Sequence, residues 1–284
     1  MKNADLHTHS YYSDGELPPK EVVRRAKRKG IKYLALTDHN SVEGIPEAIK
    51  EGKKIGVSVI PAIEIRAQED EVLGYFVDYK NREFEQEIRI IQDKLIGKIK
   101  KTMKKLNQIE IKVTFSDLLK EYHPNKNFME IHLIKYLHNK GYGPIRELYD
   151  EYISNKECKT YVPLKEISVI NSIKLIKKYG GVPVLAHPWV EPQSKKLLEE
   201  KRFKQLINAG LEGIEIDNGD RDERRDEKTI KKIKLLSKKY NLIITSGSDF
   251  HGNSLTEANR YHGMGRCNCD EKIVKQLKIL KEVE

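Results

Sequence analysis

Short apolar runs alternate with longer amphipathic stretches along most of the chain. Several of the runs are almost continuous in Val, Ile and Leu, which is typical of parallel strands buried on both faces. The predicted strands are Ala4–Thr8, Tyr33–Thr37, Val57–Ile65, Val72–Val77, Val182–Ala186, Gly213–Asp217 and Leu242–Ser246. Amphipathic helices are expected between them at Pro18–Lys29, Val169–Tyr179 and Thr229–Tyr240. This alternation predicts an α/β fold with a parallel sheet or barrel.

The strand pattern stops between about residues 80 and 163. Phe84–Gln108 predicts one long helix, because apolar residues recur there at spacings of three and four and form a single stripe. Shorter helices are expected at Ser116–Tyr122, Met129–Asn139 and Pro144–Ile153. We therefore predict a barrel made of residues 1–80 and 160–284, with a helical subdomain inserted at 81–159.

Composition indicates a folded chain that does not contact a membrane. Of the 284 residues 38% are apolar and 34% charged, and no apolar run approaches the ~20 residues that span a bilayer. The first residues turn polar too early for a secretory signal, so a cytoplasmic location is expected. The three cysteines, Cys158, Cys267 and Cys269, are too few and too unevenly spaced for a disulfide framework or a zinc knuckle, and we expect reduced thiols.

The net charge of +10 and the pI of about 9.2 favour anionic partners. Nucleotides, nucleic acid and phosphorylated small molecules all fit this charge. A basic balance also arises when many lysines occupy exposed helix faces, so charge alone does not choose among these partners.

Metal-ligand residue types gather at the predicted strand ends. Five of the nine histidines lie at or just past the carboxyl end of a strand, which is the rim where α/β barrels place their active sites. These histidines are His7, His9, His39, His187 and His251. Acidic residues join them at Asp14, Asp38, Glu64 and Asp249. One such histidine is ordinary in a loop, but chance does not account for ligand types at five separate strand ends.

Mixed imidazole and carboxylate ligands suit Zn, Mn or Fe better than Ca or Mg. About eight candidates exceed what one tetrahedral ion needs, so more than one ion is implied. Sites with several ions hydrolyse phosphoesters by activating water and by binding both the attacking and the leaving oxygen.

The motifs, taken in order, resemble the PHP (polymerase and histidinol phosphatase) family over nearly the whole chain. They are Asp-Leu-His-Thr-His-Ser at 5–10, Ser-Asp-Gly at 13–15, Leu-Thr-Asp-His-Asn at 36–40, Glu64, Ala-His-Pro at 186–188 and Gly-Ser-Asp-Phe-His-Gly at 247–252. The likeness is greatest to stand-alone bacterial members with a helical insertion, which act on nucleoside 3′,5′-bisphosphates or trim short RNA from the 5′ end. This resemblance implies a distorted (β/α)7 TIM-like barrel that carries up to three metals on its carboxyl-terminal rim.

The resemblance also implies the ligand sets. His7, His9, Glu64 and Asp249 would hold the first metal; Glu64 would bridge to a second, which His187 also binds; and Asp14, His39 and His251 would hold the third. A hydroxide between the metals would attack phosphorus. Asp249 is also placed among the catalytic residues, and Asp38 would orient its neighbours.

The chain departs from the family pattern at Glu71. The family usually has a histidine in the strand after Glu64, whereas this chain reads Glu-Val-Leu-Gly-Tyr at 71–75. The carboxylate of Glu71 could be a ligand, which would favour a harder metal such as Mn. It could equally point to solvent and leave the second metal site weak.

A second departure lies in the insertion. Related enzymes carry Arg-x-His there, with the Arg placed to hold substrate phosphate, but this chain has Glu130-Ile131-His132. His132 could contact phosphate or protonate the leaving group, or it could be a partly buried helix histidine. Glu130 cannot bind phosphate, so another cation is needed. The candidates are Lys126, Lys135 and Arg146.

Two polar segments follow the sixth predicted strand, at residues 217–220 and 221–228. The loop at residues 217–220 follows a strand on the same rim and lacks the hydroxyl and aromatic residues expected from the resemblance, which leaves the substrate open. The run Arg221–Lys228 has mixed charge and predicts a solvated loop or helix start.

The leading hypothesis is a hydrolase with two or three divalent ions (Mn, Zn or Fe) that acts on nucleotides or short oligonucleotide ends. Short RNA or DNA is therefore a possible partner. One alternative is a small-molecule phosphomonoesterase of the histidinol-phosphatase type. Another is a nucleic-acid-binding or regulatory module with an impaired site, suggested by Glu71 and Glu130. The oligomeric state is left open.

Overall fold

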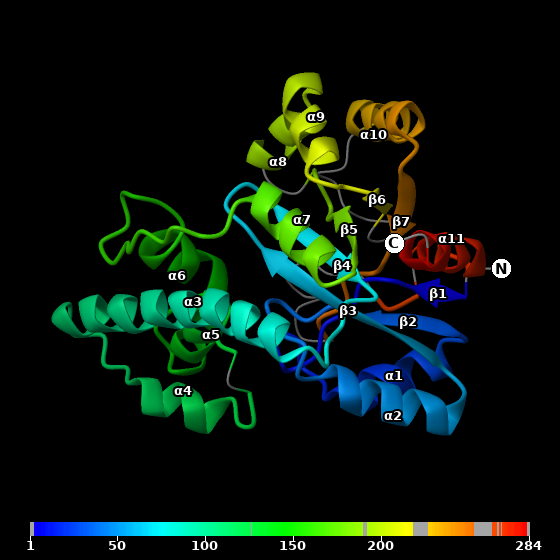
Figure 1. The fold of residues 1–284 in the computed structure, drawn as a ribbon. Coiled ribbons are helices and arrows are strands. Elements are labelled where there is room, and N and C mark those ends of the chain that lie inside the picture. The colour runs from blue at the N-terminus through cyan, green and yellow to red at the C-terminus, as the bar shows by residue number, and fades with distance from the viewer. Residues whose placement is uncertain are drawn as a thin grey trace.

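A single seven-stranded sheet, with its strands in the order β1 to β7, forms the centre of the molecule (Figure 1). The computed structural model describes residues 3–125, 127–189, 192–217, 227–252, 263–265, 267 and 269–282. The strands are β1 (Ala4–Asp5), β2 (Tyr33–Leu36), β3 (Ser58–Arg66), β4 (Glu71–Tyr75), β5 (Val182–Leu185), β6 (Gly213–Asp217) and β7 (Ile243–Ser246). All seven predicted strands are present, although β1 is shorter than expected.

The sheet curves into a barrel that is nearly closed. A parallel bridge between Thr8 and Phe250 joins the segment after β1 to the segment after β7. The strand pairs β1–β2, β2–β3, β5–β6 and β6–β7 are parallel, as the sequence predicted. The prediction of a parallel sheet is wrong at β4, because this strand runs antiparallel to both β3 and β5. Only residues 67–70 separate β3 from β4, and a parallel crossover needs a dozen or more residues, so the chain must turn back.

Helices pack around the outside of the barrel (Figure 1). They are α1 (Pro19–Arg28), α2 (Ile45–Ile55), α7 (Val169–Lys178), α8 (Pro192–Leu197), α9 (Glu200–Asn208), α10 (Glu227–Tyr240) and α11 (Glu271–Glu282). The predictions for α1, α7 and α10 are confirmed, whereas α2, α8, α9 and α11 were not predicted. Buried apolar residues of α7 and α9, such as Ile173 and Phe203, pack against strand residues such as Val72 and Ile214.

The segment between β4 and α7 forms a group of helices at one side of the barrel (Figure 1). They are α3 (Arg82–Gln108), α4 (Phe115–Glu121), α5 (Glu130–Asn139) and α6 (Ile145–Tyr152). The stripe of α3 forms a core of its own with α5, in which Leu95 and Ile99 pack near Leu133 and Leu137. The four predicted helices are confirmed. That residues 81–159 are an independent subdomain stays a prediction.

No helix in the described part of the chain is long and apolar enough to cross a membrane. The cytoplasmic location stays a prediction. Cys158, Cys267 and Cys269 are free thiols, and the last two are buried.

Candidate metal centre

The carboxylate of Glu64 lies at the centre of a group of histidines from the strand ends. Glu64 is on β3 and fully buried. Its Oε2 lies 3.1 Å from His7 Nε2, 3.3 Å from His9 Nε2 and 3.2 Å from His39 Nδ1. Its Oε1 lies 3.1 Å from His187 Nε2. The segments after β1, β2 and β5 therefore bring four imidazoles to one carboxylate, as the strand-end pattern predicted.

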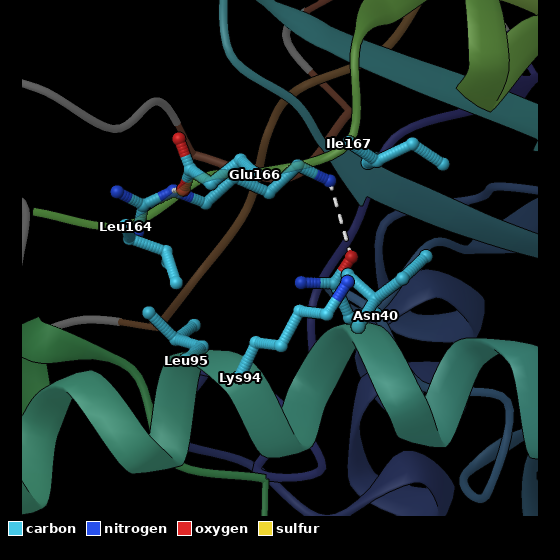
Figure 2. A pocket seen from close by; sticks show the side chains of 8 residues that line it. Asn40, Lys94, Leu95, Leu164, Glu166 and Ile167 are labelled. Carbon is cyan, nitrogen blue, oxygen red and sulfur yellow. Dashed lines mark hydrogen bonds and ion pairs between the residues drawn. The ribbon is translucent and has the colours of Figure 1, made fainter.

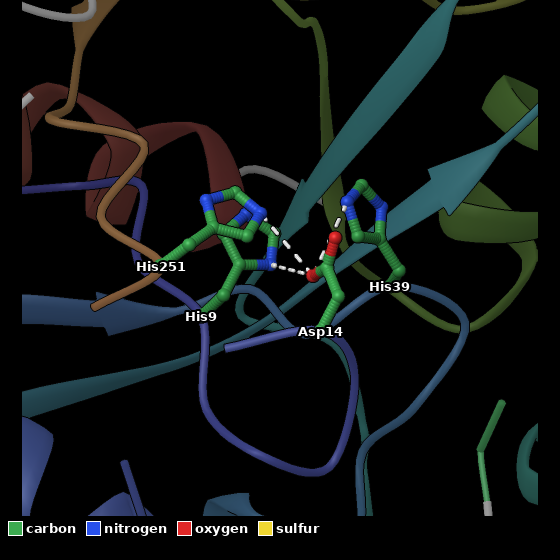
Figure 3. Close-up of side chains that lie close together, drawn as sticks. All are labelled: His9, Asp14, His39 and His251. Atoms are coloured by element: carbon green, nitrogen blue, oxygen red, sulfur yellow. Dashed lines mark ion pairs between the residues drawn. The ribbon is translucent and has the colours of Figure 1, made fainter. Parts of the chain in front are cut away.

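Two aspartates complete the cluster. Asp249 Oδ1 lies 3.4 Å from His7 Nε2 and 3.2 Å from His9 Nε2. The backbone of Asp249 has a φ of 51°, an unfavourable value for a residue with a side chain, and such strain is concentrated at functional sites. Asp14 Oδ1 lies 3.2 Å from His251 Nε2, and Figure 3 shows its carboxylate among the rings of His9, His39 and His251.

The donor atoms of these residues fall into overlapping sets, and within each set they lie within 4.8 Å of one another. The sets are His9, Asp14, His39 and His251; His7, Glu64 and His187; His7, His9 and Asp249; and His39, Glu64 and Glu71. All eight ligand candidates matched to the family motifs are thus brought together, and Glu71 joins them.

The buried donors fit divalent ions. His9 Nε2, His39 Nδ1 and Asp14 Oδ1 are buried, and although charged groups of the cluster lie near them, none makes a hydrogen bond of good geometry. A buried polar atom without a partner costs about 1–3 kcal/mol, which a coordinated cation would offset. The imidazole and carboxylate donors are those that Zn, Mn and Fe prefer.

Without an ion, the cluster favours protonated imidazoles. Burial alone lowers the pKa of His9, but the neighbouring carboxylates of Asp249 and Glu64 outweigh it and raise this pKa to about 10. Burial also lowers the pKa of His187, but the carboxylate of Glu64 outweighs this effect and raises the pKa to about 10. Burial raises the pKa of Glu64, yet His7 and His39 hold it well below its usual range. Metal binding must displace these protons, so it is coupled to proton release.

Glu71 lies beside the cluster at the start of β4. Its Oε1 is 3.4 Å from His39 Nδ1 and its Oε2 is 3.6 Å from His187 Nε2. Burial and the charge of Glu64 raise the pKa of Glu71. The carboxylate therefore faces two ligand candidates, although 24% of the side chain is exposed.

Glu215 is a buried carboxylate that the sequence reasoning missed. Its Oε1 lies 3.1 Å from His7 Nδ1, and its Oε2 accepts a hydrogen bond of 3.0 Å from the backbone N–H of His187. A carboxylate on the outer nitrogen of a ligand histidine fixes the ring and its tautomer. The available signal was one Glu between two isoleucines, Ile214 and Ile216, in strand β6.

Asp38 holds the loop that carries Asp14. It is buried and accepts hydrogen bonds from Ser10 N at 2.6 Å, Ser10 Oγ at 2.7 Å and Ser13 Oγ at 2.9 Å. These contacts fit the expectation that Asp38 orients its neighbours, and its role in the reaction stays a prediction.

His132 connects the inserted helices to the same loop. Its Nδ1 accepts a hydrogen bond of 2.9 Å from Met129 N, and its Nε2 lies 3.2 Å from Asn125 Nδ2, which donates to Ser13 O. Burial lowers the pKa of His132 to about 4. The ring is therefore neutral at pH 7.

Glu130 pairs with cations. Its Oε2 lies 2.7 Å from Arg66 Nη1 and its Oε1 lies 2.7 Å from Lys98 Nζ. Burial raises the pKa of Glu130, but these two charges outweigh it and lower the pKa to about 2. Arg66 Nε also lies 3.0 Å from Glu166 Oε1. Arg66, at the end of β3, was not among the cations considered from the sequence.

The three cations proposed from the sequence to bind phosphate are Lys126, Lys135 and Arg146. The side chain of Arg146 is 85% exposed, and its Nε lies 3.9 Å from Asp150 Oδ2 on α6. Lys135 is partly buried on α5; burial lowers its pKa, and Asp14 partly opposes this shift. Lys126 lies outside the described residues, as do residues 218–226 and with them most of the two interpreted loop segments.

A model of the PHP domain family matches residues 5–191, which is more than half of the chain. The chain belongs to the PHP domain family. The family, with the clustered ligand types, confirms the predicted class of a metal-dependent phosphoester hydrolase.

Similar proteins cover almost the whole chain. It is 26% identical over 256 residues to the 3′,5′-nucleoside bisphosphate phosphatase of Chromobacterium violaceum, with 88% of each protein covered. It is 26% identical over 262 residues to a 5′-3′ exoribonuclease of Haemophilus influenzae, with 88% of this chain and 90% of that protein covered. A structure described as a metal-dependent phosphoesterase of Bifidobacterium adolescentis has a TM-score of 0.84 at 24% identity, over 98% of this chain and 96% of that one. That likeness confirms the distorted TIM-like barrel.

Proposed function

We propose that this PHP protein hydrolyses phosphoesters of nucleotides or short oligonucleotide ends, using two or three divalent ions. The observation that carries the proposal is the position of Glu64, whose two oxygens lie 3.1–3.3 Å from nitrogens of four histidines. A buried carboxylate surrounded in this way is suited to bridge metal ions. The proposed ligands are His7, His9, Asp14, His39, Glu64, Glu71, His187, Asp249 and His251.

The ligands divide among the ions as follows. His7, His9, Glu64 and Asp249 would hold the first ion; Glu64, Glu71 and His187 the second; and Asp14, His39 and His251 the third. Ions held in this way polarise a phosphoryl group and lower the pKa of water. Glu71, as an oxygen ligand in place of an imidazole, favours a harder ion such as Mn over Zn.

The remaining residues orient the ligands and the substrate. Glu215 keeps the proton of His7 on Nδ1, so that Nε2 faces Glu64 and Asp249. Asp38 holds the Ser10–Ser13 turn and with it Asp14. His132 would contact a phosphate oxygen or the leaving oxygen by exchanging the contact that its Nε2 makes with Asn125 Nδ2.

Two observations support a nucleotide substrate. The relatives that cover most of the chain include a nucleoside bisphosphate phosphatase and an exoribonuclease. The net charge of +10 attracts anions with several phosphates more strongly than those with one. The alternative of an impaired binding module, suggested by Glu71 and Glu130, is less favoured, because the ligand types converge and Glu71 lies among them.

The full chain, stripped of metal and then loaded with Mn²⁺, Zn²⁺ or Fe²⁺, tests the proposal. Phosphate release is measured from a nucleoside 3′,5′-bisphosphate, a 5′-phosphorylated oligoribonucleotide and histidinol phosphate. We expect turnover of one of the first two, lost in His9→Ala and Asp249→Ala and kept in His138→Ala, a change at an exposed histidine of α5. Absence of turnover on every phosphoester, together with tight, salt-sensitive RNA binding, would contradict the enzyme and support a binding module.

A further inference from the structure

The charges of α3 are divided unevenly between its two halves. Residues 82–93 carry two basic and four acidic side chains, whereas residues 94–112, which include the turn after the helix, carry seven lysines and one acid. A helix dipole favours lysines near the carboxyl end, but this effect falls off within the last turn. The lysines of α3 begin about four turns before its end, so the dipole does not account for them.

Four of these lysines form one edge of the helix, which we call the α3 lysine edge. They follow one another at spacings of four, three and four residues, and residues three and four apart are neighbours on a helix surface. At a rise of about 1.5 Å per residue, the edge spans roughly 16 Å. Its members are Lys94, Lys98, Lys101 and Lys105.

The α3 lysine edge leads from the outer end of the inserted helices to the rim of the barrel (Figure 1). At the outer end, Lys105 Nζ donates a hydrogen bond of 2.6 Å to the backbone carbonyl of Tyr161. At the inner end, Lys94 and Asn40 line a pocket, and the side chain of Lys94 extends from α3 toward Asn40 (Figure 2). Asn40 directly follows the proposed ligand His39. One row of lysines thus runs from beside the proposed metal centre to the far end of α3.

Three lysines of the edge carry charge that no described carboxylate neutralises in an ion pair. Lys94 and Lys101 are exposed, and neither forms an ion pair with a residue that the structure describes. Lys105 donates to a neutral carbonyl, so that contact leaves its charge unbalanced. The edge therefore presents ammonium groups along the helix that are available to an anionic ligand.

The inner end is closer to neutral. Lys98 Nζ lies 2.7 Å from Glu130, which also pairs with Arg66. Arg66 lies 3.0 Å from Glu166 as well, and it is the direct partner of Glu71 in the ladder of β3 and β4. With the lysine that lines the pocket, three cations balance three carboxylates here. The excess of positive charge therefore lies further out along the edge.

A row of ammonium groups fits an anion whose charges also stand in a row. The phosphates of a single-stranded nucleic acid form such a row, and proteins bind them through positively charged grooves that follow the backbone. An oligonucleotide that lies along α3 would bring its end to the proposed hydrolytic centre. This continuity favours nucleic acid over an acidic peptide, which has no phosphoester for the centre to hydrolyse.

We propose that the α3 lysine edge binds the phosphate backbone of a single-stranded oligonucleotide whose end occupies the metal centre. The inference rests on the proposed function and deepens it, because it selects oligonucleotide ends over free nucleotides as the substrate class. The contacts are electrostatic and are made to the backbone, so they do not depend on base sequence. A mononucleotide at the centre does not extend along the helix and gains little from them.

Binding of oligonucleotides of two lengths tests the edge. The full chain is kept in chelator, so that no metal-dependent hydrolysis occurs, and fluorescence anisotropy measures its affinity for labelled uridylates of twelve and of two residues. The test variant, Lys94→Met with Lys101→Met, removes two exposed charges of the edge. The control, Lys234→Met with Lys238→Met, removes two exposed lysines four residues apart on α10. We expect wild type and control to bind the longer RNA about tenfold more tightly than the shorter one, and the test variant to lose most of this preference.

Salt dependence shows whether the contacts are ionic. For single strands, each phosphate that a lysine neutralises contributes about 0.7 to the slope of log affinity against log salt concentration, so the slope for the longer RNA should be shallower by about 1.4 in the test variant. The slope of the control should equal that of wild type. Equal slopes in all three proteins, or no preference for the longer RNA in wild type, would overturn the proposal. Displacement of the longer RNA by an equal concentration of twelve-residue polyglutamate would also overturn it, because the edge would then be a site for acidic peptides.

These measurements separate the edge from the function on which it rests, because none of them requires turnover. A chain that binds RNA as expected but hydrolyses no phosphoester would keep the edge and contradict the proposed function. A chain that hydrolyses a nucleoside bisphosphate but shows equal slopes in all three proteins would keep the function and lose the edge.

Discussion

Glu71 Oε1 lies 3.4 Å from His39 Nδ1, while its Oε2 lies 3.6 Å from His187 Nε2. One carboxylate thus reaches histidines from two different strand ends. The cause is the turn at residues 67–70, which reverses β4 so that Glu71 begins the strand at the rim where β3 ends. The carboxylate of Glu71 therefore lies within the group of candidate ligands, at the position where the family resemblance leads one to expect a histidine.

The first prediction concerns the metal content. Glu71→Ala should lower the number of ions bound per chain, because the second ion loses an oxygen ligand. Glu71→His should keep that number, since an imidazole is also a ligand for these metals. Elemental analysis after dialysis measures the content, with Glu83→Ala on the exposed start of α3 as the control. An unchanged content in Glu71→Ala would remove Glu71 from the centre.

The second prediction concerns Glu215. Glu215→Gln keeps the size of the side chain but removes the charge that orients His7, so metal affinity should fall roughly 10- to 100-fold. Competition with a chromophoric chelator measures the affinity, and circular dichroism monitors the fold. Glu212→Gln is the control, because Glu212 pairs with Lys177 just before β6. Equal affinities of Glu215→Gln and wild type would show that Glu215 does not support the ligand.

The third prediction concerns the Glu130 ion pairs. Glu130→Gln leaves Lys98 without its carboxylate and Arg66 with Glu166 as its remaining ion-pair partner, and breaking a buried pair costs roughly 3–5 kcal/mol. The pKa of Glu130 is lowered from 4.5 to about 2, so this stabilisation is complete above about pH 4.5 and is lost as pH falls toward 2. Urea unfolding of both proteins in chelator, at pH 7 and pH 3, should show a smaller difference at pH 3. A difference that grows at pH 3 would contradict the assigned ionisation.

The fourth prediction concerns His132. Its pKa of about 4 keeps it neutral between pH 5 and 8, so it does not titrate over this range. His132→Asn should lower kcat by roughly 10²-fold, the cost of one donor at a developing negative charge, by the same factor at every pH in the range. A fall in wild-type kcat above about pH 6.5 that disappears in the variant would instead show that His132 acts as a protonated acid.

Much of the fold could be predicted from the sequence, because buried strands and striped helices leave direct patterns. The antiparallel direction of β4 was missed, since the apolar run of a strand has no direction and only the short turn before it carries that information. Helix α2 was missed too. It contains Gly52, and a glycine weakens the sequence pattern of a helix. In the structure this glycine allows the helix to pack closely against Val57 and Val59.

The site was predictable where the residue type is itself the signal. Histidines and acids at strand ends pointed to the centre, and all five of these histidines lie against Glu64 or Asp14. Glu215 and Arg66 were not predictable, because their roles depend on distant partners. Glu215 meets His7, 208 positions away, and Arg66 meets Glu130, 64 positions away. Neither pairing leaves a trace in local spacing.

The most direct test of the account is phosphate release by the full chain before and after removal of its metal ions. The substrate is a nucleoside 3′,5′-bisphosphate, and Mn²⁺ is returned in steps while bound metal is counted. We predict that chelation abolishes release and that activity returns in proportion to the ions bound, but not in Asp249→Ala. Release that persists at its original rate in metal-free protein would contradict a metal-dependent phosphoesterase.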